Sequence, residues 1–89
     1  MYSSDTILIH ASDLDAPKIL DDGAVIQQGK KLHTLNLTAR DVFLTFDGEA
    51  TVDDVTMGFL EQHPEVDNIQ GIVGDFTRKL FQAGLLVEA

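Results

Sequence analysis

Three histidines are the side chains of this sequence best suited to metal binding or acid–base chemistry, and they lie far apart. His10, His33 and His63 fall on different predicted elements, without a second ligand at the short spacing that zinc sites usually show. The chain has no cysteine, so it offers no thiolate nucleophile, no disulfide and no cysteine-bound iron–sulfur cluster. The sequence therefore predicts neither a metal site nor a bound cofactor.

The remaining chemical patterns do not indicate catalysis. The carboxylate pairs Asp21-Asp22 and Asp53-Asp54 stand at an expected turn and helix start, with no nucleophile beside a base. Ser12-Asp13-Leu14 lacks the order of an acyl carrier attachment site, which needs serine between aspartate and leucine at a helix start. Gly71–Gly74 matches a GxxG pattern, but Asp75 follows it, whereas an RNA-binding loop needs cationic flanks. We therefore predict that the protein is not an enzyme.

Composition narrows the class of protein further. Six Lys and Arg residues face 15 Asp and Glu residues, and the resulting net charge of −9 is dispersed along the chain. Such a surface is repelled by phosphate backbones, so we expect no nucleic-acid partner, and solubility is the simplest reading of the charge. Apolar runs are too short to span a membrane, and the first residues lack a signal-peptide pattern, so we expect a cytoplasmic protein without a membrane partner. Eighty-nine residues predict one domain, 1–89.

Short strands are predicted in the first part of the chain. Thr6–His10 is apolar and β-branched, and reads as a strand or an N-terminal arm. Three further segments, separated by Asp-Gly and Gln-Gly-Lys turns, predict an antiparallel meander: Pro17–Leu20, Ala24–Gln27 and Leu32–Leu35. In the last of these, His33 and Leu35 share one face while Leu32 and Thr34 share the other.

Three helices are predicted after the strands. The first begins at Thr38 as N-cap and ends at Asp47-Gly48, and its apolar residues recur at helical spacing. The second begins with a Thr51/Asp54 capping box and ends at His63-Pro64. The third starts at Asp67 or Asn68, ends at Gly84, and is followed by an extended Leu85–Val87 segment. The expected stripe of the third helix comprises Ile69, Ile72, Val73, Phe76, Leu80 and Ala83.

Three residues of the third helix need a separate explanation. Gly71 and Gly74 each lower helix stability by about 1 kcal/mol relative to alanine, so we expect another element to pack closely against them. Phe81 lies off the apolar stripe and is either a contact residue or covered by the C-terminal tail.

Ordered motifs across residues 14–88 resemble the PqqD family of peptide chaperones and precursor-peptide recognition elements. The resemblance is carried by Leu35-Asn36 before Thr38-Ala39, by Phe46-Asp47-Gly48 before Thr51-Val52, and by Gly84-Leu85-Leu86 after an amphipathic helix. It implies an α+β, winged-helix-like fold with a three-stranded antiparallel sheet followed by three helices. It also implies a domain without catalytic activity, which binds a ribosomally made precursor peptide and hands it to a modifying enzyme, often a radical S-adenosylmethionine enzyme.

The same resemblance implies where the peptide binds. In such domains the leader segment adds as a strand to the third strand of the meander, in a groove facing the third helix, as in other cases of strand addition. Carried onto this chain, the implied peptide-binding residues are Leu32, His33, Thr34, Leu35, Phe76, Arg78, Lys79, Leu80 and Ala83. Arg78 and Lys79 would pair with acidic leader residues.

Two positions depart from the family pattern. Many relatives carry aromatic residues where this chain has His33-Thr34, which puts the leader motif in doubt. Phe81 stands where a polar residue is usual, which changes the expected end of the groove.

A winged-helix regulatory or protein-interaction module is the alternative. Gln70, Arg78, Lys79 and Gln82 would be the outward polar residues of a DNA-reading helix, but Asp75 lies among them and the chain is acidic. DNA binding is therefore disfavoured, whereas a protein-interaction module is poorly separated from a peptide chaperone by sequence.

Overall fold

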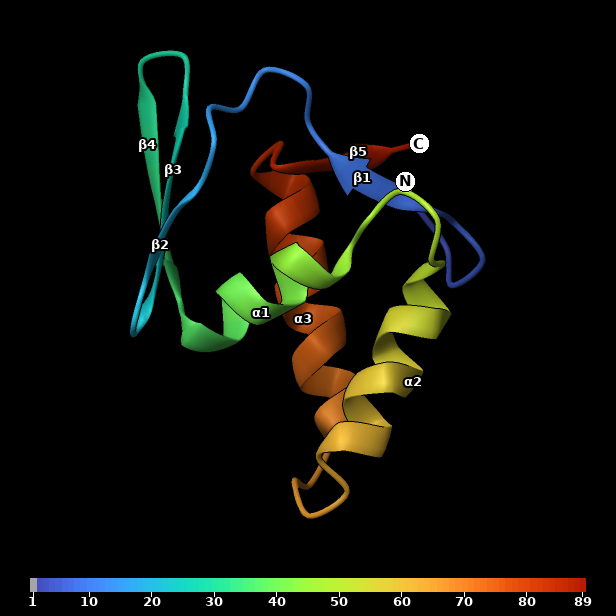
Figure 1. Ribbon diagram of the computed structural model, residues 1–89. Coiled ribbons are helices and arrows are strands. Elements are labelled where there is room, and N and C mark those ends of the chain that lie inside the picture. The colour runs from blue at the N-terminus through green and yellow to red at the C-terminus, as the bar shows by residue number, and fades with distance from the viewer. Residues whose placement is uncertain (1) are drawn as a thin grey trace.

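The computed structural model describes residues 2–89, which form five strands and three helices (Figure 1). In chain order the elements are β1 (Leu8–His10), β2 (Lys18–Leu20), β3 (Gly23–Gln28), β4 (Lys31–Asn36), α1 (Leu37–Thr45), α2 (Val52–Gln62), α3 (Ile69–Gln82) and β5 (Leu86–Glu88). The expected α+β class, with three antiparallel strands and three helices, is confirmed. No helix among these residues is long and apolar enough to cross a membrane.

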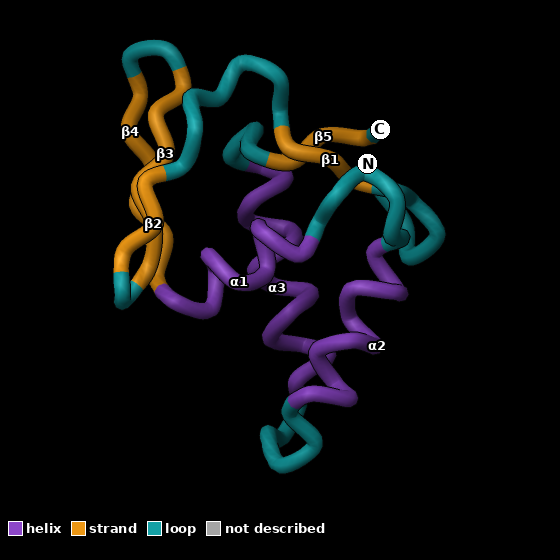
Figure 2. Tube along the Cα trace, viewed as in Figure 1, coloured by secondary structure: helices purple, strands orange, loops and turns teal. Residues whose placement is uncertain are grey.

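The predicted meander is the larger sheet, with strand order β2-β3-β4 (Figure 2). A two-residue turn joins each pair of strands, and Gly29, at a φ of 60°, occupies the first central position of the β3–β4 turn. The alternation of burial in β4 is as expected: Leu35 is buried, whereas the Leu32 side chain is 67% exposed on the other face. One face of β4 therefore belongs to the core.

The register fixes the direction of the backbone groups of β4. Gln28 and Lys31 close a two-residue hairpin, so they form a hydrogen-bonded pair, and hydrogen-bonded and non-hydrogen-bonded pairs alternate from there. His33 and Leu35 thus bond to β3, while the N–H and C=O groups of Leu32 and Thr34 point away from it. The backbone hydrogen bond from Asp15 N to Gln27 O, on the opposite edge of β3, fits the same alternation. Among residues 2–89, β4 pairs with β3 alone.

Helix α3 is central to the helical part, since it contacts α1, α2 and β5 (Figure 1). The predicted apolar stripes meet in one core. Phe43 and Phe46 of the first stripe are almost fully buried, as are Val73 and Leu80 of the third. Ala83, which the stripe also included, is exposed because the chain turns away at the end of the helix.

The chain ends form a second, two-stranded sheet that the sequence did not reveal. β1 pairs antiparallel with β5, with Ile9 opposite Val87. This pairing decides the open question of Thr6–His10, whose last three residues are a strand, and confirms that the segment after Gly84 is extended. His10 also contacts α1: its ring is stacked on Phe43 at 3.8 Å, and its Nε2 lies 2.6 Å from the Phe43 carbonyl oxygen.

The residues before β1 cap helix α2. The carbonyl groups of Ser4 and Thr6 accept hydrogen bonds from the N–H groups of Asp53 and Val52, at 2.9 Å each. Thr51 and Asp54 complete the predicted capping box, with both reciprocal hydrogen bonds present. The backbone N–H groups in the first turn of α2 have no acceptor within the helix. The carbonyl groups before β1 and the capping box together supply acceptors for them.

The predictions about the cap of the first helix and about the helix glycines need correction, whereas the choice between Asp67 and Asn68 as the cap of α3 is decided in favour of Asn68. Helix α1 is capped by Asn36 rather than Thr38, because the Asn36 Oδ1 accepts from Ala39 N at 2.8 Å. Asn68 caps α3 in a left-handed conformation (φ 57°) without a side-chain hydrogen bond. Close packing does not explain Gly74, since a Cβ there would meet no atom within 4 Å, whereas at Gly71 it would meet the Asn68 side chain of the same chain segment.

Alanine substitutions at two glycines should have opposite effects. A Cβ at Gly23 would lie 1.9 Å from the backbone oxygen of Leu35, so Gly23→Ala should push β3 and β4 apart and destabilise the fold by about 1–3 kcal/mol. Gly74→Ala, in open space on a helix, should stabilise it by about 1 kcal/mol. Urea unfolding of both variants tests this pair, and equal effects would contradict the β3–β4 packing described above.

Amide hydrogen exchange should alternate along β4. The His33 and Leu35 amides bond to β3 and should exchange slowly, while the Leu32 and Thr34 amides, which face the edge, should exchange fast. Residue-resolved NMR exchange rates measure this directly. Four equally protected amides would mean that the edge is covered in solution.

Candidate functional site

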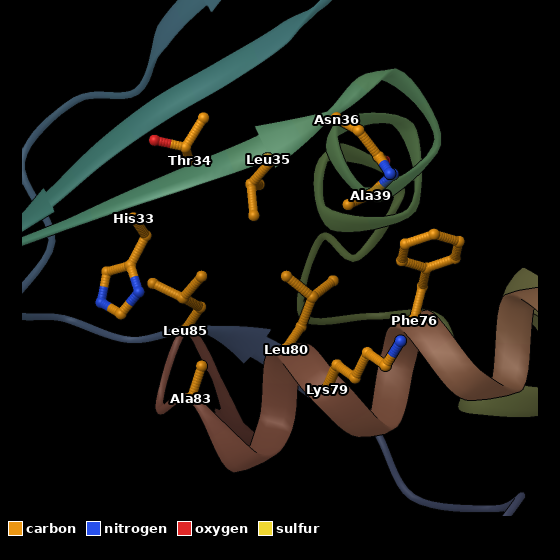
Figure 3. Close-up of a pocket in the computed structure, with 10 residues that line it drawn as sticks. All are labelled: His33, Thr34, Leu35, Asn36, Ala39, Phe76, Lys79, Leu80, Ala83 and Leu85. Carbon is orange, nitrogen blue, oxygen red and sulfur yellow. The ribbon is translucent and has the colours of Figure 1, made fainter.

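A groove lies between β4 and the C-terminal half of α3 (Figure 3). It encloses a cavity of about 270 Å³. Its lining residues come from β4, the first turns of α1, the last turns of α3 and the residue before β5: His33, Thr34, Leu35, Asn36, Ala39, Phe76, Lys79, Leu80, Ala83 and Leu85. We call this cavity the β4–α3 groove.

Seven of the nine residues expected at the peptide site line this groove, and Leu32 and Arg78 do not. The Leu32 side chain is on the far face of β4, so the backbone of this residue alone reaches the edge. Arg78 points to the other side of α3, where it lines a second cavity. Whether the seven residues bind a peptide stays a prediction.

The end of helix α3 builds the floor of the groove. Gly84, at a φ of 81°, allows Leu85 N to donate to Leu80 O at 3.0 Å and Gly84 N to Phe81 O at 3.1 Å. These two bonds define a Schellman motif, in which the residue after the glycine packs on the residue five positions earlier. Leu80 and Leu85 are that pair, and Leu35 projects toward them from β4 (Figure 3). The floor is therefore apolar.

The cations of α3 are engaged by a carboxylate of the same helix. Lys79 Nζ lies 3.1 Å from Asp75 Oδ2, and Arg78 pairs with the other oxygen of Asp75. The hydrogen bond and charge of Lys79, with a smaller contribution from Arg78, hold the pKa of Asp75 below its usual value. Lys79 Nζ is also 5.7 Å from the centre of the Phe76 ring. An acidic ligand residue would have to compete with Asp75 for either cation.

Polar side chains join the β3–β4 hairpin to the end of α3. The Nε2 group of Gln28 donates to the Asp13 carboxylate at 3.1 and 3.3 Å and to the Gly84 carbonyl at 3.1 Å. The Oε1 atom of Gln28 lies 3.0 Å from His33 Nε2. Gln28 thus connects the β3–β4 hairpin both to the loop after β1 and to the end of α3.

Sequence reasoning missed three lining residues: Asn36, Ala39 and Leu85. Asn36 had been left between the expected strand and helix and Ala39 had been assigned to the helix, whereas in the structure Asn36 is the last residue of β4 and Ala39 lies in the first turn of α1. The sequence did contain a signal for Leu85. An apolar residue directly after the glycine that ends a helix commonly packs back on the helix, and Leu85 follows Gly84 in this way.

A second cavity, of about 450 Å³, lies on the opposite side of α3 and is lined by Tyr2, Arg78, Phe81 and Gln82. The Tyr2 and Phe81 rings meet edge to face, with their centres 4.9 Å apart. Burial raises the pKa of Tyr2, and the positive charge of Arg78 opposes this shift. Phe81 is therefore partly covered by Tyr2, whereas the sequence had left open whether it is a contact residue or is covered by the C-terminal tail.

Neither cavity has the side chains of a metal centre. Among residues 2–89 no three His, Cys, Asp or Glu side chains come together in a way that could hold a metal ion. His10, His33 and His63 have separate partners: the Phe43 carbonyl, Gln28 and, at 3.9 Å, Glu65. The lining of the β4–α3 groove accordingly combines an apolar floor with the polar residues His33, Thr34, Asn36 and Lys79.

Comparison with known proteins does not add to this description. A scan against protein-family models, a search of curated proteins and a search of solved structures each found no match for the chain.

Proposed function

We propose that this protein is a stand-alone leader-peptide-binding domain. It captures a segment of a ribosomally synthesised precursor peptide as an additional strand on β4, and presents that peptide to a separate modifying enzyme of the radical S-adenosylmethionine type. The proposal includes membership of the PqqD-like class suggested by the sequence motifs, a winged-helix-like arrangement of the meander and three helices, and a cytoplasmic location.

The observation that carries the proposal is the open edge of β4 beside the groove. Leu32 and Thr34 direct their N–H and C=O groups outward, and within residues 2–89 nothing pairs with them. Unpaired backbone groups on a sheet edge are a template for another strand. The outward groups supply affinity for any extended backbone, and the adjoining cavity gives room for alternate side chains of that strand.

Other strand edges are less suited to this role. β2 and β5 are three residues long, against six for β4, so an added strand would form fewer hydrogen bonds there. The Leu20 carbonyl of β2 already accepts a hydrogen bond from the Arg40 side chain. β4 combines length, an unpaired edge and an adjacent cavity.

Charge favours this function over DNA recognition by α3. Arg78 and Lys79, the two cations of that helix, are both held by Asp75. The whole chain carries a net charge of −9, which opposes contacts with phosphates. A protein-interaction module without a role in peptide modification would use the same groove, and a neighbouring gene for a precursor peptide or a radical enzyme would favour the peptide chaperone.

Selection from a displayed library of random peptides should yield ligands of the β4–α3 groove. Titrating a selected peptide into the ¹⁵N-labelled protein should shift the amide resonances of residues 30–36 and 76–84 in a saturable manner, because those residues form the edge and its opposite wall. Failure to select any peptide, or shifts centred on the Tyr2–Phe81 cavity, would contradict the proposal.

A proline at position 34 should weaken binding without unfolding the protein. Thr34 N–H points away from β3, so Thr34→Pro removes a donor from the open edge and leaves the β3–β4 ladder intact. We expect peptide affinity to fall about tenfold or more by isothermal titration calorimetry, from the lost hydrogen bond and the bulk of the ring. Thr34→Val, which keeps the N–H, and Glu61→Lys, on α2, should bind as wild type. If all three variants bind equally, strand addition on β4 is wrong.

A further inference from the structure

The side-chain amide of Gln28 has a single chemically consistent orientation. Its nitrogen lies within 3.3 Å of both oxygens of the Asp13 carboxylate and 3.1 Å from the Gly84 carbonyl oxygen, and all three atoms are acceptors. Flipping the amide would set its own oxygen against these acceptors. The amide oxygen is therefore committed to the opposite side, 3.0 Å from His33 Nε2.

The orientation of Gln28 decides the tautomer of His33. An amide oxygen can only accept, so His33 Nε2 must carry the proton and donate to it. In the neutral imidazole the other nitrogen, Nδ1, is then an acceptor. Among residues 2–89 no hydrogen bond to this atom is present, and His33 is one of the residues that line the groove. The groove thus presents, beside its apolar floor, a hydrogen-bond acceptor at His33.

We propose that His33 determines the sequence specificity of the groove by accepting, at Nδ1, a hydrogen bond from a hydroxyl or carboxamide side chain of the bound strand. This inference rests on the proposed function. The side chains that fit are serine, threonine, asparagine and glutamine, which carry a neutral donor. A carboxylate, which has no proton to donate, is disfavoured by the lone pair of Nδ1.

The two-residue separation of His33 and Leu35 on β4 predicts how far apart two residues of the bound strand lie: the one that donates to His33 and an aliphatic one. His33 and Leu35 lie two residues apart on the same face, and an added strand has the same repeat of about 3.3 Å per residue. A bound side chain that reaches His33 is therefore separated by one residue from the side chain that rests on Leu35 and Leu80. The expected recognition motif is a donor and an aliphatic residue with any one residue between them.

A library comparison tests the specificity. Peptides that the wild-type protein selects from a random displayed library should be enriched in Ser, Thr, Asn or Gln at the position two residues from the aliphatic residue that rests on Leu35 and Leu80. We expect an enrichment of about five- to tenfold, because a neutral hydrogen bond contributes roughly this factor. His33→Leu should select the same aliphatic residue without that enrichment. His33→Asn, whose side-chain oxygen replaces the acceptor near Nδ1, should restore it. Thr→Val exchange in a selected peptide should weaken binding to wild type and not to His33→Leu.

The outcomes separate this inference from the proposed function. Selected peptides that shift the resonances of the groove but show no donor preference, or a preference that survives in His33→Leu, overturn the role of His33 and leave peptide capture intact. Failure to select any peptide counts against the proposed function itself. Independently, ¹⁵N NMR of the imidazole in the unliganded protein should show His33 protonated at Nε2, and a ring protonated at Nδ1 instead overturns the inference.

Discussion

The pairing of the two chain ends with each other is the constraint on which the rest of this structure depends. β1 and β5 are antiparallel partners, and Ala11 N and Ala89 N extend the ladder beyond them by donating to Leu85 O and Ile7 O. The tail is thereby committed to β1, in a sheet separate from the meander. A C-terminal strand that instead lay on β4 would have satisfied the same backbone groups and filled the groove. The open edge is thus a consequence of where the tail pairs.

The same pairing connects the groove to the core. The chain leaves α3 at Gly84, whose left-handed conformation turns it toward β5, and Leu85 is fixed between that turn and the first residue of the strand. Leu85 is 1% exposed and Leu80 is 3% exposed, so the floor of the groove is the outer surface of well-packed core residues. Because interiors are close-packed, such a floor moves little. A ligand side chain therefore meets a preformed surface and not one that must be ordered on binding, which lowers the cost of binding.

Local patterns in the sequence were sufficient for most elements, and non-local pairings were not. The meander, the Thr51 capping box and the end of α3 at Gly84 follow from turn and cap residues that act over a few positions. The start of α1 was misplaced because Asn36 and Thr38 are both good caps, and the choice between them depends on where β4 ends. The β1–β5 sheet joins segments from opposite ends of the chain, each three residues long, and no turn between them sets a register.

Seven residues of the β4–α3 groove had been named because the resemblance to PqqD-like domains implies them, and the structure brings these seven together. The role of Gln28 was not predictable, because its three partner residues lie on separate segments.

Charge acts on this groove at two different ranges. Close to the groove, Asp75 already engages Lys79 and Arg78, so one of the two positive charges of α3 is neutralised within the helix. At long range, the net charge of −9 raises the local concentration of cationic peptides and slows the approach of acidic ones. Electrostatic attraction of this kind affects mainly the association rate and weakens with salt, whereas contacts in a desolvated groove affect mainly the dissociation rate. Under the proposed function, basic residues outside the bound motif would therefore speed encounter, while the edge of β4, the Leu35–Leu80–Leu85 floor and His33 would decide which segment stays bound.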